Sequence, residues 1–289
     1  MKTIRFAHLA DTHLCREGKS AFLDIAVRDN FEKAIDYFCA MNDKLDFVVV
    51  TGDIINDNDL EDYRYAKGFI DRMQEKLGSP IFLTIGNHDD RGYFFEGYLE
   101  EEPQSAYYYS RDINGLRLIV LDSKDNDVDG EIGEEQLLWL KQQLEEPAEC
   151  GTVLAFHHPT AMSEFGLGES SLRDTSALYD IIWGTDVIGV LTGHTHRSNQ
   201  NIIMDNILSL TADSMAYSLV VNGDDVKMIE RFGFNMVTIL NQTMHNNTVT
   251  FGSEKVLAQI SLKKIMSMVG QIKTTTESLK EFETLLKGA

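Results

Sequence analysis

Polar groups of a kind that bind metal ions occur at five places along this chain. They are Asp11 with His13, Asp53, Asn87 with His88, His157, and His194 with His196. The set holds carboxylates, imidazoles and an amide but no thiolate, which suits Mn, Fe or Zn better than Ca or Mg. It exceeds what one tetrahedral ion needs, so a carboxylate shared between two ions is the natural solution. Two divalent ions about 4 Å apart can clamp a phosphate and lower the pKa of a bridging water.

Each polar group follows an apolar stretch that is typical of a buried strand, at 4–9, 47–50, 81–85, 153–156 and 187–191. Helical spacing begins near residues 30 and 60, so the first part of the chain alternates strand and helix, which predicts a parallel sheet with right-handed crossovers. Ligands bind at the carboxyl ends of such strands. In a strand-like segment, residues two apart point the same way, so Asp11 with His13, and His194 with His196, can each hold one ion.

Taken singly, each group has an ordinary structural explanation. Asp11 and Asp53 are common cap or turn residues, and Asn87 follows Gly86, which lets the backbone turn sharply. The pair His157-His158 before Pro159 is also compatible with packed, satisfied histidines. The recurrence of such groups at five strand ends is what predicts a metal site.

Composition excludes several classes of protein. The formal net charge is −20 over 289 residues, so the surface repels long polyanions and extended nucleic acid is a poor partner. Three unevenly spaced cysteines form no CxxC pair, which argues against a disulfide framework or a thiolate metal site. The chain has no apolar run of membrane-spanning length and no signal-peptide pattern at its start, so we expect a cytoplasmic protein without a membrane partner.

The remaining sequence predicts further elements. Residues 107–109 and 116–121 are expected to form a hairpin, and 163–173 a mobile Gly- and Ser-rich loop. Short strands between 202 and 239 predict a second, largely antiparallel sheet packed on the first. We expect a catalytic domain at 1–240 and a C-terminal extension at 241–289. Helices at 256–269 and 276–286 would make this extension a cap or a contact between the subunits of a homo-oligomer.

These motifs together resemble those of the calcineurin-like metallophosphoesterases. The matching strings are Asp11-x-His13, Gly52-Asp53, Gly86-Asn87-His88-Asp89, His157 and Gly193-His194-x-His196, spread over roughly residues 1–240. The strings around 86–91, 157–159 and 184–187 are most similar to bacterial class III cyclic-nucleotide phosphodiesterases and their glycerophosphodiesterase relatives. The resemblance implies a four-layer α/β/β/α sandwich.

The resemblance also implies roles for the residues. One divalent ion would be held by Asp11, His13, Asp53 and His196, and a second by Asp53, Asn87, His157 and His194. A metal-bridging hydroxide would attack phosphorus in line, with His88 stabilising the transition state and protonating the leaving group. Asp89 would orient His88.

We therefore predict a dinuclear metal-dependent phosphodiesterase acting on a small phosphodiester, with a 3′,5′-cyclic nucleotide as the leading substrate. A glycerophosphodiester or a phosphomonoester is the alternative, and a nuclease is disfavoured by the acidic charge. A metal-free binding scaffold would predict missing ligands, whereas all seven positions hold coordinating residue types. Arg91 and His158 are candidate substrate contacts; a surface salt bridge for Arg91 and a packing role for His158 are the alternatives.

Overall fold

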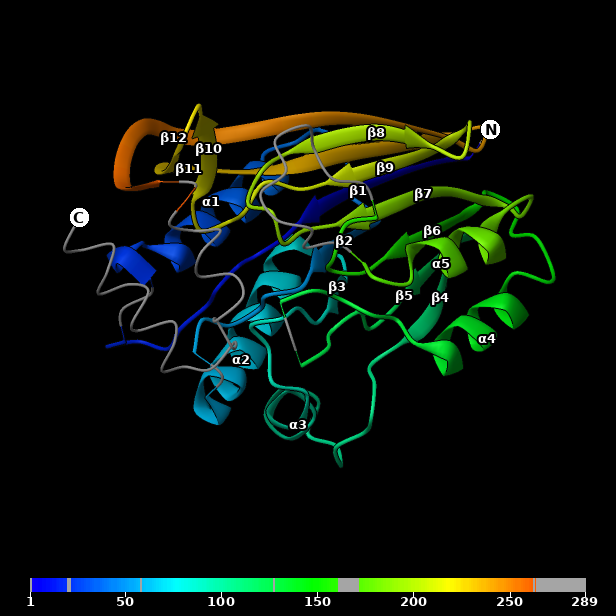
Figure 1. The fold of residues 1–289 in the computed structure, drawn as a ribbon, viewed down its shortest axis with the longest axis horizontal. Helices are drawn as coiled ribbons and strands as arrows, with labels where there is room; N and C mark the ends of the chain where they lie inside the picture. The colour runs from blue at the N-terminus through cyan, green and yellow to red at the C-terminus, as the bar shows by residue number, and fades with distance from the viewer. Residues whose placement is uncertain are drawn as a thin grey trace.

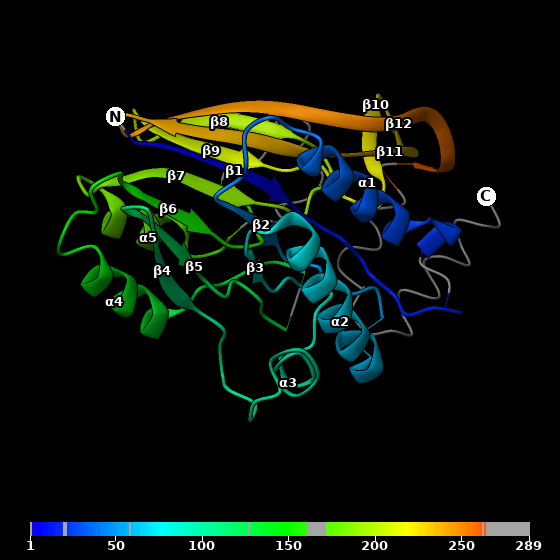
Figure 2. The ribbon, with the colours of Figure 1, turned by 180° about the vertical axis from the view of Figure 1, so that it is seen from behind.

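Two six-stranded sheets stack face to face, with helices on the outer side of each (Figure 1). This architecture is seen in a computed structural model, which describes residues 2–19, 22–57, 59–126, 128–160, 172–261 and 263. The layers run helix, sheet, sheet, helix, and the same stacking is visible from behind (Figure 2).

The first sheet has the strand order β10-β11-β1-β2-β3, with β12 paired to β11. Its parallel part consists of β1 (Thr3–Leu9), β2 (Phe47–Thr51) and β3 (Ile81–Thr84). The helices that connect these strands are α1 (Val27–Cys39) and α2 (Leu60–Leu77). Its antiparallel part consists of β10 (Ser218–Asn222), β11 (Asp225–Leu240) and β12 (Thr243–Ser261). The βαβαβ order predicted from the sequence is confirmed.

The second sheet has the strand order β4-β5-β6-β7-β9-β8. Its members are β4 (Tyr109–Ile113), β5 (Leu116–Val120), β6 (Thr152–Ala155), β7 (Val187–Thr192), β8 (Asn199–Ile203) and β9 (Ile207–Thr211). The four inner strands are parallel, and the two edge strands are antiparallel. Its outer helices are α4 (Glu134–Gln143) and α5 (Thr175–Ile182).

Short helical segments complete the described structure. They are a 3-10 turn at Phe22–Asp24, α3 (Arg91–Tyr93) and a π-helical segment at Phe94–Leu99. No helix among the described residues is both long and apolar enough to cross a membrane.

Three hydrophobic layers hold the four structural layers together. Strand β2 shows the arrangement, since Val48 and Val50 pack beneath α1 and α2 while Phe47 and Val49 lie between the sheets. A third cluster, which includes Leu140, fills the space between the second sheet and its helices α4 and α5. Because β2 is covered on both faces, its continuous β-branched run is the expected pattern for a central parallel strand.

The second sheet is not the one predicted from the short strands at 202–239. Strands β8 and β9 join β7, whereas β10 and β11 return to the first sheet, where β11 lies antiparallel to β1. The predicted strands exist, but they are divided between the two sheets. The cause is that alternation of apolar residues identifies a strand without identifying the strand it pairs with.

The prediction of a helical extension after residue 240 is also wrong for the residues that the structure describes. Residues 243–261 form β12, which pairs with β11 along its length, and Asn241 and Gln242 form the left-handed turn between them. The β-branched and aromatic run from Thr248 to Phe251 favours this strand. The rest of the predicted helices, and residues 163–171 of the predicted loop, lie outside the described residues.

We predict that β12 is required for the stability of the first sheet. A chain ending at residue 240 is expected to lose about 3 kcal/mol or more of unfolding free energy relative to one ending at 263. The reason is that β12 contributes the buried side chains of Met244 and Ile260, each worth about 1.5–3 kcal/mol. Urea unfolding of the two chains measures the difference. Equal stabilities would instead support a domain boundary at 240.

Candidate metal centre

The seven predicted metal ligands meet at the seam between the two sheets. Four of them follow strands of the first sheet, and three follow strands of the second, as the element order shows for Asp11, His13, Asp53, Asn87, His157, His194 and His196. The carboxyl ends of β1, β2, β3, β6 and β7 therefore converge on one place, as expected for ligand sites in parallel sheets.

The first cluster contains Asp11, His13, Asp53 and His196. One ligand atom from each lies within 4.8 Å of the others, and all four side chains are buried. The Nε2 atoms of His13 and His196 are 3.2 Å apart, and Asp11 Oδ1 lies 3.4 Å from His196 Nε2. These are the side chains expected to hold the first ion.

The second cluster forms around the side-chain oxygen of Asn87. This Oδ1 atom lies 3.0 Å from His157 Nε2 and 2.9 Å from His194 Nδ1. Asp53 Oδ2 lies 3.4 Å from His157 Nε2 and 3.9 Å from His13 Nε2, so one carboxylate oxygen faces both clusters. This geometry suits a carboxylate that bridges two ions.

Hydrogen bonds to backbone carbonyls fix the tautomer of two imidazoles so that one ring nitrogen is free to bind a metal ion. Nδ1 of His157 lies 2.8 Å from the Thr51 carbonyl, and Nδ1 of His196 lies 3.1 Å from the Tyr217 carbonyl. A carbonyl oxygen only accepts, so each Nδ1 carries the proton and donates it. In the neutral ring, Nε2 is then left with a lone pair directed into the cluster, which is the usual arrangement for a metal-bound histidine.

Electrostatics favours a positive charge in each cluster. Burial lowers the pKa of His157, but the Asp53 and Asp11 carboxylates and the hydrogen bonds to the ring together outweigh this effect and raise the pKa to about 9. Burial and the Asp11 carboxylate act in the same opposed way on His196, and its pKa is raised. By contrast, burial holds the pKa of His13 well below its ordinary value and lowers that of His194 to about 3. Each cluster thus contains one neutral imidazole, from His13 or His194, and one imidazole whose surroundings stabilise positive charge. This combination fits a divalent ion.

Five of the seven side chains stand on backbone in the left-handed region. Their φ angles are 53° for Asp11, 43° for His13, 50° for Asp53, 72° for His194 and 50° for His196. This conformation costs roughly 1–2 kcal/mol for a residue other than glycine. It also means that strand alternation is not what brings the paired ligands together, contrary to the reasoning from the sequence. Tight loops direct them instead, and strain of this kind gathers at functional sites.

Gly86 is needed for space rather than for a sharp turn. Its φ angle lies outside the left-handed region, but a Cβ atom there would lie 2.3 Å from Asp53 Oδ1. The loop after β3 can therefore approach the Asp53 carboxylate only because residue 86 has no side chain. The backbone N–H of His88 uses this approach to donate to Asp53 Oδ1 at 2.9 Å.

Asp89 does not orient His88, so that prediction is wrong. Its buried carboxylate accepts from the backbone N–H groups of Ile54, Ile55 and Gly86 at 2.8–3.3 Å, and from the Tyr63 hydroxyl at 3.1 Å. These donors occupy both oxygens. Asp89 thus ties the loop that carries Asp53 to the loop that carries Asn87, and it acts on the ligands rather than on His88.

His88 lies beside both clusters without belonging to either ligand set. Its Nε2 atom is 4.0 Å from Asp53 Oδ2, and its ring meets the His13 ring edge to face with centroids 4.9 Å apart. Its Nδ1 atom is buried and has no hydrogen-bond partner among the described residues. The catalytic role assigned to His88 stays a prediction, and this position suits it.

Arg91 is paired within the protein, in agreement with the salt-bridge alternative rather than with a substrate contact. Its guanidinium donates to both carboxylate oxygens of Asp122, at 2.7 and 3.1 Å, and to the Lys124 carbonyl at 2.8 Å. The Lys124 ammonium in turn donates to the Asn87 carbonyl at 3.1 Å. The sequence pattern does not reveal Lys124 or its neighbour Ser123, because the loop that carries them has no metal-binding motif. This loop follows β5, one more strand that ends at the site.

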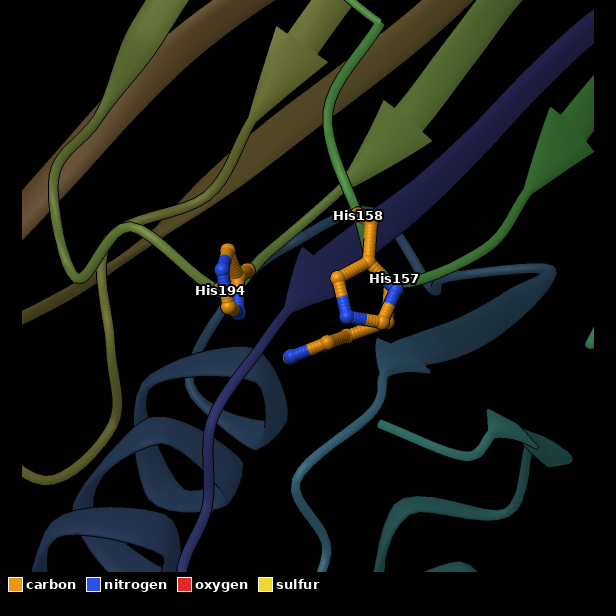
Figure 3. Close-up of side chains that lie close together, drawn as sticks. All are labelled: His157, His158 and His194. Atoms are coloured by element: carbon orange, nitrogen blue, oxygen red, sulfur yellow. The ribbon is translucent and has the colours of Figure 1, made fainter. Parts of the chain in front are cut away.

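His158 lies against the second cluster (Figure 3). Its ring centroid is 4.8 Å from that of His194 and 4.9 Å from that of His157, and its Nδ1 atom lies 2.8 Å from Ser123 Oγ. Burial is the main reason that its pKa falls well below the ordinary value. The ring therefore packs directly against the two histidines of the second cluster.

Comparison with known proteins agrees with this site. The family model described as calcineurin-like phosphoesterase matches residues 4–198. A cAMP/cGMP dual specificity phosphodiesterase of Mycobacterium tuberculosis is 30% identical over 85% of this chain and 79% of that protein. A probable glycerophosphodiester phosphodiesterase of Arcobacter nitrofigilis is 26% identical over 74% of this chain and 79% of that protein.

Solved structures show the same fold at low identity. A dimetal phosphatase from Danio rerio has a TM-score of 0.59 at 14% identity and covers 84% of this chain and 98% of that one. A purple acid phosphatase from yellow lupin has a TM-score of 0.57 at 15% identity and covers 92% of this chain and 55% of that one.

The chain belongs to the calcineurin-like phosphoesterase family and is a metal-dependent phosphoric ester hydrolase. The four-layer metallo-dependent phosphatase fold expected from its motifs is confirmed.

We predict that Asp89→Asn weakens metal binding, because the new amide places a donor against an N–H or O–H group that now donates to the carboxylate. A buried group left unpaired in this way costs about 1–3 kcal/mol. Mn²⁺ affinity measured by calorimetry should fall roughly tenfold, with a lower melting temperature. Tyr63→Phe removes only one of the donors and is the matched control, with a smaller loss. Unchanged Mn²⁺ affinity in Asp89→Asn would contradict the tie between the two loops.

Proposed function

We propose that this chain is a dinuclear phosphodiesterase that hydrolyses a small phosphodiester, with a 3′,5′-cyclic nucleotide as the leading substrate. The observation that carries the proposal is the pair of complete ligand clusters that share Asp53. The names of several relatives support the substrate class, since proteins from Mycobacterium tuberculosis and Rhodococcus erythropolis, each 30% identical, are named as cyclic nucleotide phosphodiesterases.

Two divalent ions, of Mn, Fe or Zn, would supply positive charge for the phosphate and a water of lowered pKa. Asp53, the carboxylate common to both clusters, would hold both ions. His88 Nε2 faces the same carboxylate from outside the ligand sets. A proton at that nitrogen can stabilise charge on the phosphate and pass to the leaving oxygen. The chain thus provides a general acid next to, and separate from, the groups that bind metal.

A glycerophosphodiester is the second candidate substrate, because the relative from Arcobacter nitrofigilis carries that name. Both candidates are small diesters and need the same two clusters. The net charge of −20 makes a long polyanion a poor substrate for either version of the site.

The substrate prediction is tested by a panel assay of the purified protein in Mn²⁺. The panel contains cyclic AMP, cyclic GMP, glycerophosphoethanolamine, bis-p-nitrophenyl phosphate and p-nitrophenyl phosphate. We expect the diesters to be hydrolysed faster than the monoester, the cyclic nucleotides with the highest kcat/KM, and a chelator to abolish all turnover. Faster hydrolysis of the monoester would overturn the diesterase assignment. Turnover that survives chelation would overturn metal dependence.

A pair of substitutions separates metal binding from catalysis. Asn87→Ala should lower affinity at the second ion and most of the turnover, because its Oδ1 lies at the centre of that cluster. His88→Ala should keep both ions and lose roughly 10²–10⁴-fold in kcat, the usual contribution of a positioned acid, most severely for poor leaving groups. Metal analysis and steady-state kinetics check both variants. Loss of metal in His88→Ala would make His88 a ligand instead.

A further inference from the structure

The imidazole of His158 has one nitrogen that the protein leaves without a partner. The side chain is fully buried, and Nε2 has no hydrogen-bond partner in the described part of the chain. An unsatisfied buried polar atom costs about 1–3 kcal/mol, so its presence points to a group that arrives with a ligand. Figure 3 shows that the ring turns this edge toward the space between His157 and His194.

The other ring nitrogen is occupied by Ser123. The hydroxyl oxygen of Ser123 accepts from the backbone N–H groups of His157 and His158, each at 3.2 Å. These two bonds use both of its lone pairs. Its single proton is then donated to His158 Nδ1 at 2.8 Å, the one partner of the three that can accept. With Nδ1 as acceptor, the ring proton is on Nε2, which makes the unpartnered atom a donor.

The Val128 carbonyl is the competing influence on this tautomer. Its hydrogen bond to the ring raises the pKa of His158, and because Nε2 has no partner this bond favours a proton on Nδ1. The Ser123 hydroxyl proton has no other acceptor among its three partners, so the 2.8 Å contact with His158 Nδ1 favours the opposite tautomer.

The ring has little freedom to turn away. A Cβ atom at Gly130 would lie 2.3 Å from His158 Nδ1, so the Gly130 backbone packs directly against the ring. The ring is fixed on one side by this backbone and on the Nδ1 side by Ser123. Its N–H is therefore held in a constant direction, as a preorganised hydrogen-bond donor requires.

The Nε2 atom of His158 points toward the second cluster (Figure 3). One nitrogen from each of His157, His158 and His194 lies within 4.8 Å of the others. A protonated nitrogen cannot coordinate a metal ion, and the second ligand set is complete without it. The N–H needs an acceptor, and a phosphate held against the second ion would bring oxygens to this place.

We propose that His158 donates its Nε2 proton in a hydrogen bond to a non-bridging phosphate oxygen of the substrate, and that Ser123 sets the tautomer that makes this possible. The inference rests on the proposed function and adds a substrate contact to it. His158 contacts the substrate, and Ser123 is a positioning residue that acts through it.

The tautomer is tested first, in the Zn²⁺-loaded protein with ¹⁵N-labelled histidine. Ring nitrogen spectra, with the His158 signals assigned by their loss in His158→Gln, should show the proton on Nε2. In Ser123→Ala the proton should move to Nδ1, toward the Val128 carbonyl, while the ring itself remains. A proton on Nδ1 in the unsubstituted protein would overturn the proposal.

The contact is tested by the affinity of the Zn²⁺-loaded protein for inorganic phosphate, measured by calorimetry. His158→Gln places an amide N–H near the position of Nε2, and His158→Asn places one near Nδ1, so the pair differs in donor position. We expect affinity to fall about tenfold or more in His158→Asn and in Ser123→Ala, as for one lost bond to a charged group. His158→Gln should keep most of the affinity. Zinc content and folding, checked by metal analysis and melting temperature, should match in all variants.

The remaining outcomes are distinct. Equal phosphate affinity in all variants would leave His158 as a packed neighbour, and zinc loss in both His158→Gln and His158→Asn would make it a ligand. Either result overturns the inference while the proposed function survives. If phosphate binding follows the expected pattern but the substrate panel shows no diester hydrolysis, the inference survives and the proposed function fails.

Discussion

The mutual repulsion of closely packed acceptors is the constraint on which the site depends. Two carboxylates, an amide oxygen and several imidazole lone pairs gather in a buried space between the sheets, and two Nε2 atoms come within 3.2 Å of each other. In an interior of low dielectric such a cluster is strongly unfavourable without positive charge. The raised pKa values of His157 and His196 show that the cluster stabilises positive charge. A divalent ion supplies more positive charge at this place than a proton does.

The surrounding structure holds the acceptors together against that repulsion. Left-handed backbone at five ligand positions directs side chains that a regular strand would send apart. Asp89 joins the loops after β2 and β3, and the absence of a side chain at Gly86 lets those loops touch. These devices come from backbone conformation and backbone hydrogen bonds. The positions of the acceptors are thus set by the protein's own backbone, which is what preorganised electrostatic catalysis requires.

The convergence of the seven predicted ligand side chains could be foreseen because each follows a strand that its own local sequence reveals. Parallel strands bring their carboxyl ends to one edge, so local patterns were enough to gather them. The division of β8–β12 between the sheets could not be read locally, because a strand's partner depends on the whole fold. The same limit hid the partners of Asp89, Arg91 and Ser123, whose hydrogen bonds join residues 3–35 positions apart. From the sequence alone, Asp89 cannot be distinguished from an ordinary turn residue, because its partners lie on another loop as well as its own.

The position of Asp53 between the two clusters has a consequence for the cohesion of the whole domain. Each cluster combines side chains from loops of both sheets. An ion bound there would therefore connect the first sheet to the second. An ion that binds only the folded chain adds RT ln(1 + [ion]/Kd) to stability. The free energy of unfolding would therefore rise with the logarithm of the free ion concentration. Metal supply would then contribute to the stability of the sandwich, in addition to its apolar core.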